Sequence, residues 1–186
     1  MGVMITSNYI SNIFQLHTRT LILLWISTFC FCVLSGGSLF GMITYSLMIS
    51  KPISILQLMK PPNGGGFIFF VLFNTLMELI LFPLLINRLY NHSISINRML
   101  LTSSGIYYIS RAWTYIYFAP VIVNTFIPIA SKEIITLDTI LESQLIQWIQ
   151  LSWIRCFADC FSSFILLIVI SEYSANPNTK PIKKLD

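Results

Sequence analysis

Apolar residues along this chain gather into four long runs, separated by polar stretches that contain proline and glycine. The runs cover about Thr20 to Ile49, Phe67 to Ile86, Met99 to Phe118 and Leu145 to Ile170. A helix needs about 20 apolar residues to cross a bilayer, so each run is long enough for one crossing. No stretch alternates apolar and polar residues as a barrel strand does. The pattern predicts an all-α polytopic membrane protein, a four-transmembrane-helix bundle that forms a single membrane domain over residues 1–186.

The first run is longer than one crossing requires. At a rise of about 1.5 Å per residue it overshoots a hydrocarbon core of about 30 Å. The first helix must therefore tilt, or continue as an interfacial helix beyond the small residues Ser35-Gly36-Gly37-Ser38 at its centre.

The connections between the runs are short. The first, Lys51 to Gly66, holds prolines and a glycine run, which stop one helix and free the chain before the next. The third, Ala119 to Gln144, holds Pro120 and Pro128 with apolar residues between them, a pattern that suggests a re-entrant piece dipping back into the interface. The polar, lysine-containing end from 174 to 186 predicts a flexible cytoplasmic tail that touches anionic headgroups.

Composition excludes a soluble monomer. Hydrophobic residues make up 55% of the chain and charged residues 10%, whereas about a quarter of a soluble domain is charged. The net charge of +4 is too small and too scattered for nucleic-acid binding, so the partners expected are membrane lipids, with a lipophilic small molecule or other membrane subunits as further candidates. Near the helix ends Arg19, Arg88, Arg98, Lys180, Lys183 and Lys184 share one side, against Lys51, Lys60 and Lys132 on the other. This bias predicts a multi-pass protein with both termini in the cytoplasm.

Ionisable side chains inside the runs are the strongest functional signal. They are Glu78 in the second run, Arg111 in the third, and Arg155 with Asp159 in the fourth. A charge at mid-bilayer costs at least about 2.5–3.5 kcal/mol and normally faces the bundle interior with a partner. Helical spacing places polar and aromatic residues on the same faces: Asn74 with Glu78; Tyr107, Tyr108 and Tyr115 with Arg111; Trp148 with Arg155 and Asp159.

Two interpretations of these charges stay open. In the structural one, Arg155 and Asp159 neutralise each other within one helix, while Glu78 and Arg111 join two helices. In the functional one, the three faces form a polar pocket for a small ligand or substrate. There Arg111 or Arg155 binds an anionic or carbonyl oxygen, Glu78 or Asp159 transfers a proton, and the tyrosines line the walls.

Other small and reactive residues carry less information. Gly37-Ser38-Leu39-Phe40-Gly41 forms a small-xxx-small ridge, which predicts a helix-packing face. The cysteines at 30, 32, 156 and 160 have neither redox nor zinc spacing, and are interpreted as packing residues. The histidines at 17 and 92 do not cluster with carboxylates, so neither a metal nor another cofactor is expected.

The second half of the chain resembles a known family. Pro120-Val121-Ile122-Val123-Asn124 follows the third run, and the fourth run opens with Trp148 and bears Trp153 and Arg155. These features are similar to the anthrone oxygenase-like family of small four-helix membrane proteins. The resemblance implies that Asn124, Trp148 and Arg155 belong to one site, and a few relatives are described as cofactor-independent oxygenases of polycyclic phenols. Where the family tends to have an Asn one turn before the arginine, this chain has Ser152.

Three functions follow as hypotheses. The first is a membrane enzyme or lipophilic-ligand binder with its site among the second, third and fourth helices. The second is a structural or assembly subunit of a larger membrane complex, in which the same charges are satisfied across an interface. The third is a proton-coupled exporter of small molecules with Glu78 as the proton carrier.

Overall fold

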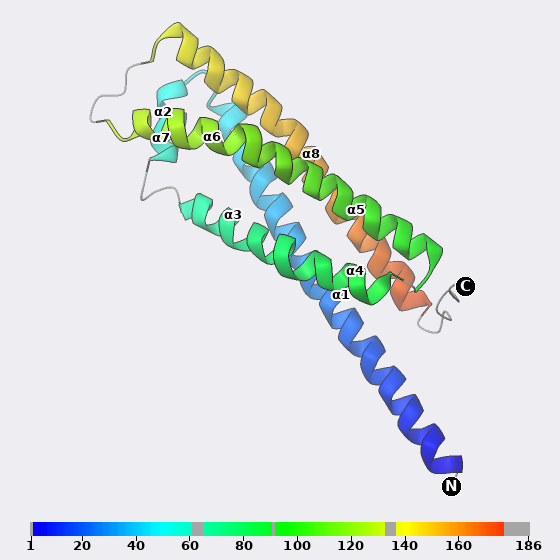
Figure 1. Ribbon diagram of the computed structural model, residues 1–186. Helices are drawn as coiled ribbons and strands as arrows, with labels where there is room; N and C mark the ends of the chain where they lie inside the picture. The colour runs from blue at the N-terminus through cyan, green and yellow to red at the C-terminus, as the bar shows by residue number, and fades with distance from the viewer. Residues whose placement is uncertain (1, 61–64, 91, 133–136, 177–186) are drawn as a thin grey trace.

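The computed structural model describes residues 2–60, 65–90, 92–132 and 137–176, and nearly all of them are helical. The elements follow in the order α1 (Gly2–Leu47), α2 (Pro52–Met59), α3 (Gly65–Leu76), η1 (Met77–Leu81), α4 (Phe82–Leu89), α5 (Ile94–Trp113), η2 (Thr114–Phe118), α6 (Ala119–Val121), η3 (Ile122–Phe126), α7 (Ile127–Ala130) and α8 (Thr139–Ala175), where η marks a π-helical turn (Figure 1). Four segments are long and apolar enough to cross a membrane: Gln15–Leu47, Val71–Leu89, Ile94–Ala130 and Thr139–Ala175. These segments confirm the all-α, four-helix prediction.

Helix α1 is a single unbroken helix. It passes through the residues Ser35 to Ser38 without a break and ends at Leu47, so no separate interfacial helix starts at its centre. Its N-terminal part extends beyond the other helices (Figure 1). A separate short helix, α2, follows, with Pro52 in its first turn, where a missing N–H is tolerated.

The predicted bounds of the third connection were wrong. Residues 119–130 continue the third membrane helix, and residues 139–144 already belong to α8. The connection therefore shrinks to residues 131–138, and there is no re-entrant piece in the described part of 119–144. The predicted tail starts inside α8, which includes Ser174 and Ala175; residues 177–186 lie outside the described residues.

Three prolines lie inside membrane helices rather than ending them. A proline lacks an N–H, and its ring collides with the carbonyl of residue i−4. Each of these prolines comes two residues after a π-helical turn: Pro83 after η1, Pro120 after η2 and Pro128 after η3. The turns are closed by backbone bonds that span five residues, from Phe82 to Met77, Ala119 to Thr114 and Ile127 to Ile122. The wider turn makes room for the ring, which is why the helix continues where the sequence predicted a loop.

Serines mediate the closest helix contacts. Helix α8 packs between α1 and α5 (Figure 1). Ser35 and Ser163 share a hydroxyl hydrogen bond of 2.6 Å between α1 and α8, and Ser103 of α5 donates to the carbonyl of Ser162 at 3.1 Å. Small side chains let membrane helices approach closely. Gly41 of the predicted ridge does not serve this role, because a Cβ added there would meet no atom within 4 Å.

Buried apolar side chains form two clusters with a polar layer between them. One cluster contains Leu24, Phe31, Phe82, Tyr107 and Leu166, and the other contains Leu56, Phe118, Phe126, Leu145 and Trp148. Along α5 and α8, the residues between these clusters include Arg111, Arg155 and Asp159. Cys30 and Cys156 are buried as packing residues, whereas Cys32 is exposed.

The outer faces of the helices are apolar. Phe29 of α1, Ile109 of α5 and Phe157 of α8 are at least 64% exposed, and such faces are compatible with contact with membrane lipids. The length and apolar composition of its four helices thus indicate a multi-pass membrane protein. Which side the termini occupy stays a prediction.

Candidate functional site

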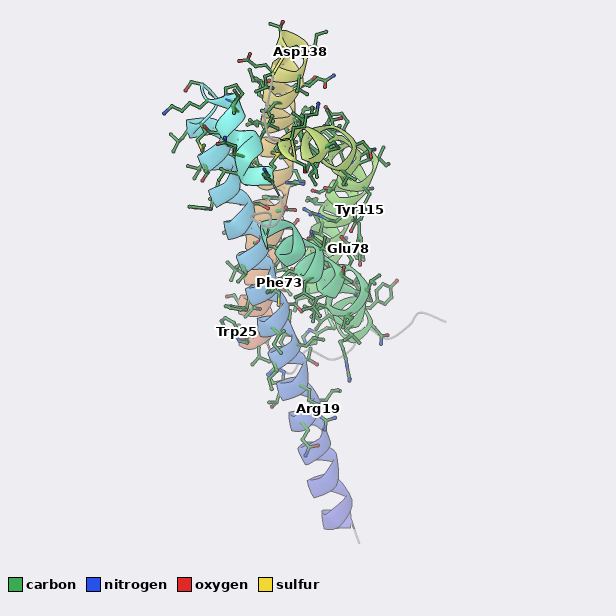
Figure 2. The ribbon with its side chains drawn as sticks, turned by 90° about the vertical axis from the view of Figure 1, so that its left-hand side faces the viewer. Arg19, Trp25, Phe73, Glu78, Tyr115 and Asp138 are labelled. Carbon is green, nitrogen blue, oxygen red and sulfur yellow. The ribbon has the colours of Figure 1, made fainter. Side chains whose placement is uncertain are left out.

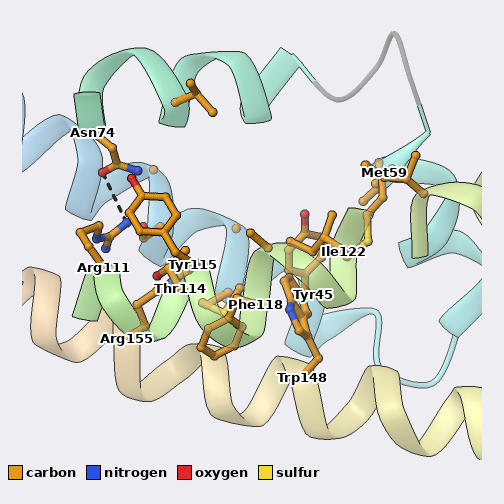
Figure 3. A pocket seen from close by; sticks show the side chains of 18 of the residues that line it. Tyr45, Met59, Asn74, Arg111, Thr114, Tyr115, Phe118, Ile122, Trp148 and Arg155 are labelled. Atoms are coloured by element: carbon orange, nitrogen blue, oxygen red, sulfur yellow. Dashed lines mark hydrogen bonds between the residues drawn. The ribbon is translucent and has the colours of Figure 1, made fainter. Parts of the chain in front are cut away.

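A cavity of about 400 Å³ lies between the membrane helices, bounded by α1, α2, α3, the proline-containing segment from η2 to α7, and α8. Small-molecule sites commonly measure about 300–1,000 Å³. Asn74 and Arg111 lie at one end of it, and Tyr45, Trp148 and Met59 at the other (Figure 3). Its walls are mainly apolar, so the cavity suits a lipophilic body with a polar group.

Arg111 is held by several partners at one end of the cavity, although its Nε is buried without a hydrogen-bond partner among the described residues. Its Nη2 donates to both carboxylate oxygens of Asp159 at 2.6 Å, and its Nη1 donates to Asn74 Oδ1 at 3.4 Å. The Tyr107 hydroxyl donates to the same Asn74 oxygen at 3.0 Å, and the guanidinium lies 5.0 Å from the centre of the Tyr107 ring. The side chains of Arg111 and Asp159 are 6% and 4% exposed. The positive charge of Arg111 is therefore neutralised inside the protein.

Glu78 does not join this group. The Tyr115 hydroxyl donates to its two carboxylate oxygens at 3.0 and 2.9 Å, and the Tyr108 hydroxyl donates to its backbone carbonyl at 2.7 Å. Glu78 and Tyr115 lie beside each other at the side of the bundle (Figure 2). Because Glu78 belongs to η1 and Tyr115 to η2, the bond connects two of the π-turns that the prolines require.

Arg155 is the cation of the cavity wall that makes no ion pair with a described residue. It lines the cavity, and its guanidinium carbon lies 5.1 Å from the centre of the Phe118 ring. Among the described residues it makes neither an ion pair nor a hydrogen bond, and its Nε is buried without a partner. Asp159, one turn away, is occupied by Arg111. Both pairings of the structural interpretation are therefore wrong: Arg155 does not bind Asp159, and Glu78 does not bind Arg111.

The cavity brings together about half of the residues that the sequence proposed. Asn74, Arg111, Tyr115, Trp148 and Arg155 line it. Asp159 binds Arg111 but does not itself line the cavity. Four further residues are not part of the lining: Glu78, Tyr107, Tyr108 and Asn124.

Asn124 faces away from the cavity. It is an exposed residue of η3, so the expectation that it shares a site with Trp148 and Arg155 is wrong. Each π-turn accommodates an extra residue, which rotates the following part of the helix by about 100°. The expectation for Asn124 came from the family resemblance, which placed it in a loop rather than in a helix with π-turns.

Several lining residues were not proposed as site residues from the sequence. Tyr45 and Gly41 come from α1, Met59 from α2, and Phe118 from η2. The helix α2 could have been found from Pro52 followed by the apolar residues of Ile53 to Met59. Tyr45 and Phe118 are ordinary aromatic residues of membrane helices, and only the assembled bundle places them together.

Comparison with protein families, curated proteins and solved structures finds no match for this chain. The resemblance to the anthrone oxygenase-like family stays a prediction. The function therefore has to be argued from the cavity itself.

Proposed function

We propose that this protein binds a lipophilic small molecule in the cavity between its membrane helices. The observation that carries the proposal is Arg155, a cation that makes no ion pair with a described residue, in the wall of an apolar cavity of about 400 Å³. Ionisable residues within membrane helices are expensive and usually mark a substrate or ion site. An apolar wall favours an alkyl or aromatic body, and a few polar groups fix its orientation.

The lining supports binding more directly than catalysis. Among the described side chains, no carboxylate and no imidazole lines the cavity. A general base needs to reach the proton that it removes, and Asp159 is occupied by Arg111. The hydroxyls of Tyr45, Thr114 and Tyr115 remain as groups that can orient an oxygen-bearing ligand.

Two glycines of α1 provide a matched test. A Cβ at Gly36 or at Gly41 would meet no atom within 4 Å, so both positions accept a side chain. Gly41 lines the cavity, whereas Gly36 is exposed on the outside of the helix and does not line it. Gly41→Leu should therefore fill the cavity, and Gly36→Leu should leave it open.

The experiment measures binding of a pyrene-labelled single-chain alcohol to the protein in nanodiscs. We expect saturable binding by the wild type and by Gly36→Leu, and loss of that binding in Gly41→Leu. Thermal unfolding of both variants controls for folding. Equal binding by all three proteins would mean that the cavity is not the site.

A further inference from the structure

Three polar groups on one face of α8 are buried and lack a hydrogen-bond partner among the described residues. They are Trp148 Nε1, Ser152 Oγ and Arg155 Nε. Their spacing of four and three residues places them on the same side of the helix. Trp148 and Arg155 also line the cavity, about 10 Å apart along the helix axis at 1.5 Å per residue. Trp148 and Arg155 thus belong to one wall of the cavity, whereas Ser152 is fully buried and is not part of the lining.

The chemistry of these groups defines the missing partner. An indole N–H and a guanidinium can only donate hydrogen bonds, and a hydroxyl can donate one. Buried polar groups are almost always hydrogen-bonded. The partner that completes this wall is therefore a hydrogen-bond acceptor, which in a small molecule means oxygen atoms.

The charges show that this acceptor is an anion. Arg111 is neutralised by Asp159 at 2.6 Å, and the Glu78 carboxylate is bound by Tyr115 outside the lining. Arg155 is left as the cation of the wall that makes no ion pair with a described residue. A neutral carbonyl would satisfy its donors but not its charge, whereas a carboxylate satisfies both and matches the planar fork of an arginine.

We propose that the ligand is a single-chain lipophilic carboxylate whose oxygens bind the guanidinium of Arg155 in the wall that α8 contributes to the cavity. The inference rests on the proposed function and specifies its ligand. A cavity of about 400 Å³ is at the small end of the range for ligand sites, which favours one alkyl chain over a diacyl phospholipid. The apolar side chains of Phe118 and Ile122 in the same lining are suited to that chain.

The test compares dodecanoic acid with dodecanol, which share a chain and differ in the head group. Each competes with the pyrene-labelled alcohol for the protein in nanodiscs of neutral lipid, in a buffer alkaline enough to keep the acid ionised. The acid should bind the wild type at least about tenfold more tightly than the alcohol, a difference of about 1.4 kcal/mol. Comparing this ratio between variants cancels the different partition of the two probes into the bilayer.

Arg155→Gln should abolish the preference for the acid, so that acid and alcohol compete for the cavity with similar affinity. This variant is expected to fold, because it removes an unpaired charge rather than half of a pair. Arg155→Lys should retain part of the preference, since it keeps the charge but not the fork. Arg88→Gln, at an exposed cation outside the cavity, is the control for general electrostatic attraction.

The outcomes separate this inference from the proposed function. Equal affinity of the wild type for acid and alcohol, with both lost in Gly41→Leu, would overturn the inference and leave the cavity as a binding site. Absence of saturable binding by either probe would overturn both. Tighter binding of phosphatidic acid than of dodecanoic acid would overturn the single-chain assignment. An acid preference that survives in Arg155→Gln would show that another group binds the anion.

Discussion

The ion pair between Arg111 and Asp159 should be the most sensitive point in the stability of the bundle. Its atoms lie 2.6 Å apart, and both side chains are almost fully buried. Unit charges about 4 Å apart, as in such a pair, attract by about 4 kcal/mol at an effective dielectric constant of about 20. Removing one partner leaves the other charge buried without compensation, which typically costs about 3–5 kcal/mol. We expect Asp159→Asn and Arg111→Met each to lower the free energy of unfolding by that amount.

The double variant distinguishes a pair from two independent contributions. Desolvation of two charges offsets most of their attraction, so replacing both with uncharged side chains is often neutral or stabilising. Arg111→Met with Asp159→Asn should therefore be much less destabilised than the sum of the single changes. The free energies would come from reversible unfolding in bicelles, with Glu78→Gln as the control at a half-buried carboxylate outside the pair. Additive losses, or single-variant losses below about 1 kcal/mol, would refute the reasoning.

Three further changes test other parts of the bundle. Tyr115→Phe removes both hydrogen bonds to the Glu78 carboxylate and should lower the unfolding free energy by about 1.5–3 kcal/mol. Tyr117→Phe is the control. Equal losses of unfolding free energy in the two variants would argue against the contact between Tyr115 and Glu78. Gly41→Ala should stabilise α1 by about 0.5–1 kcal/mol, because the position is open. The same variant should weaken ligand binding. Destabilisation by Gly41→Ala would show that another helix packs against Gly41. Burial, followed by the nearby charge of His17, lowers the pKa of His92. The thermal midpoint of unfolding should therefore fall as the pH drops below about 6.5. In His92→Asn this fall should be smaller.

The sign of the pH effect follows from which form of His92 the fold favours. The lowered pKa means that the folded protein prefers the neutral imidazole. Its contribution to stability is present above the unfolded pKa and is lost as the pH falls through the folded pKa. Glu172 opposes the shift but does not reverse it. His92 and His17 both contact the Tyr173 ring, at 4.7 and 4.9 Å between ring centres, so protonation places charge where α1, α8 and the loop before α5 meet.

The number of membrane helices was predictable, but their ends were not. Long apolar runs report crossings because hydrocarbon excludes any unpaired backbone, and this holds without knowing how the helices pack. Prolines were misleading: Pro120 and Pro128 suggested a connection with a re-entrant piece, yet the π-turns before them preserve the helix. Helical spacing brought Tyr115 to the cavity, whereas Asn124, proposed only from the family resemblance, is not part of the lining.

Pairing of the charges could not be predicted for a different reason. Spacing places Arg155 and Asp159 one turn apart on the same helix, and it leaves several pairings equally possible. The rotation of α5 against α8 decides among them, and it brings Arg111 rather than Arg155 to Asp159. The prediction that polar groups from the second, third and fourth helices converge holds for Asn74, Arg111 and Asp159. It fails for Glu78, which the sequence could not distinguish from them.

Arg155, which makes no ion pair with a described residue, should make the ligand-free protein less stable than a variant with an apolar residue at this position. On insertion scales, Arg at a helix centre is about 3 kcal/mol less favourable than Leu. The contact of Arg155 with the Phe118 ring at 5.1 Å offsets about 1–2 kcal/mol of this unfavourable free energy. We therefore expect Arg155→Leu to stabilise the ligand-free protein by about 1–2 kcal/mol and to abolish binding of dodecanoic acid, the trade-off typical of a functional residue. Loss of stability in Arg155→Leu would instead mean that the arginine holds the helices together, and the cavity would then be a by-product of packing.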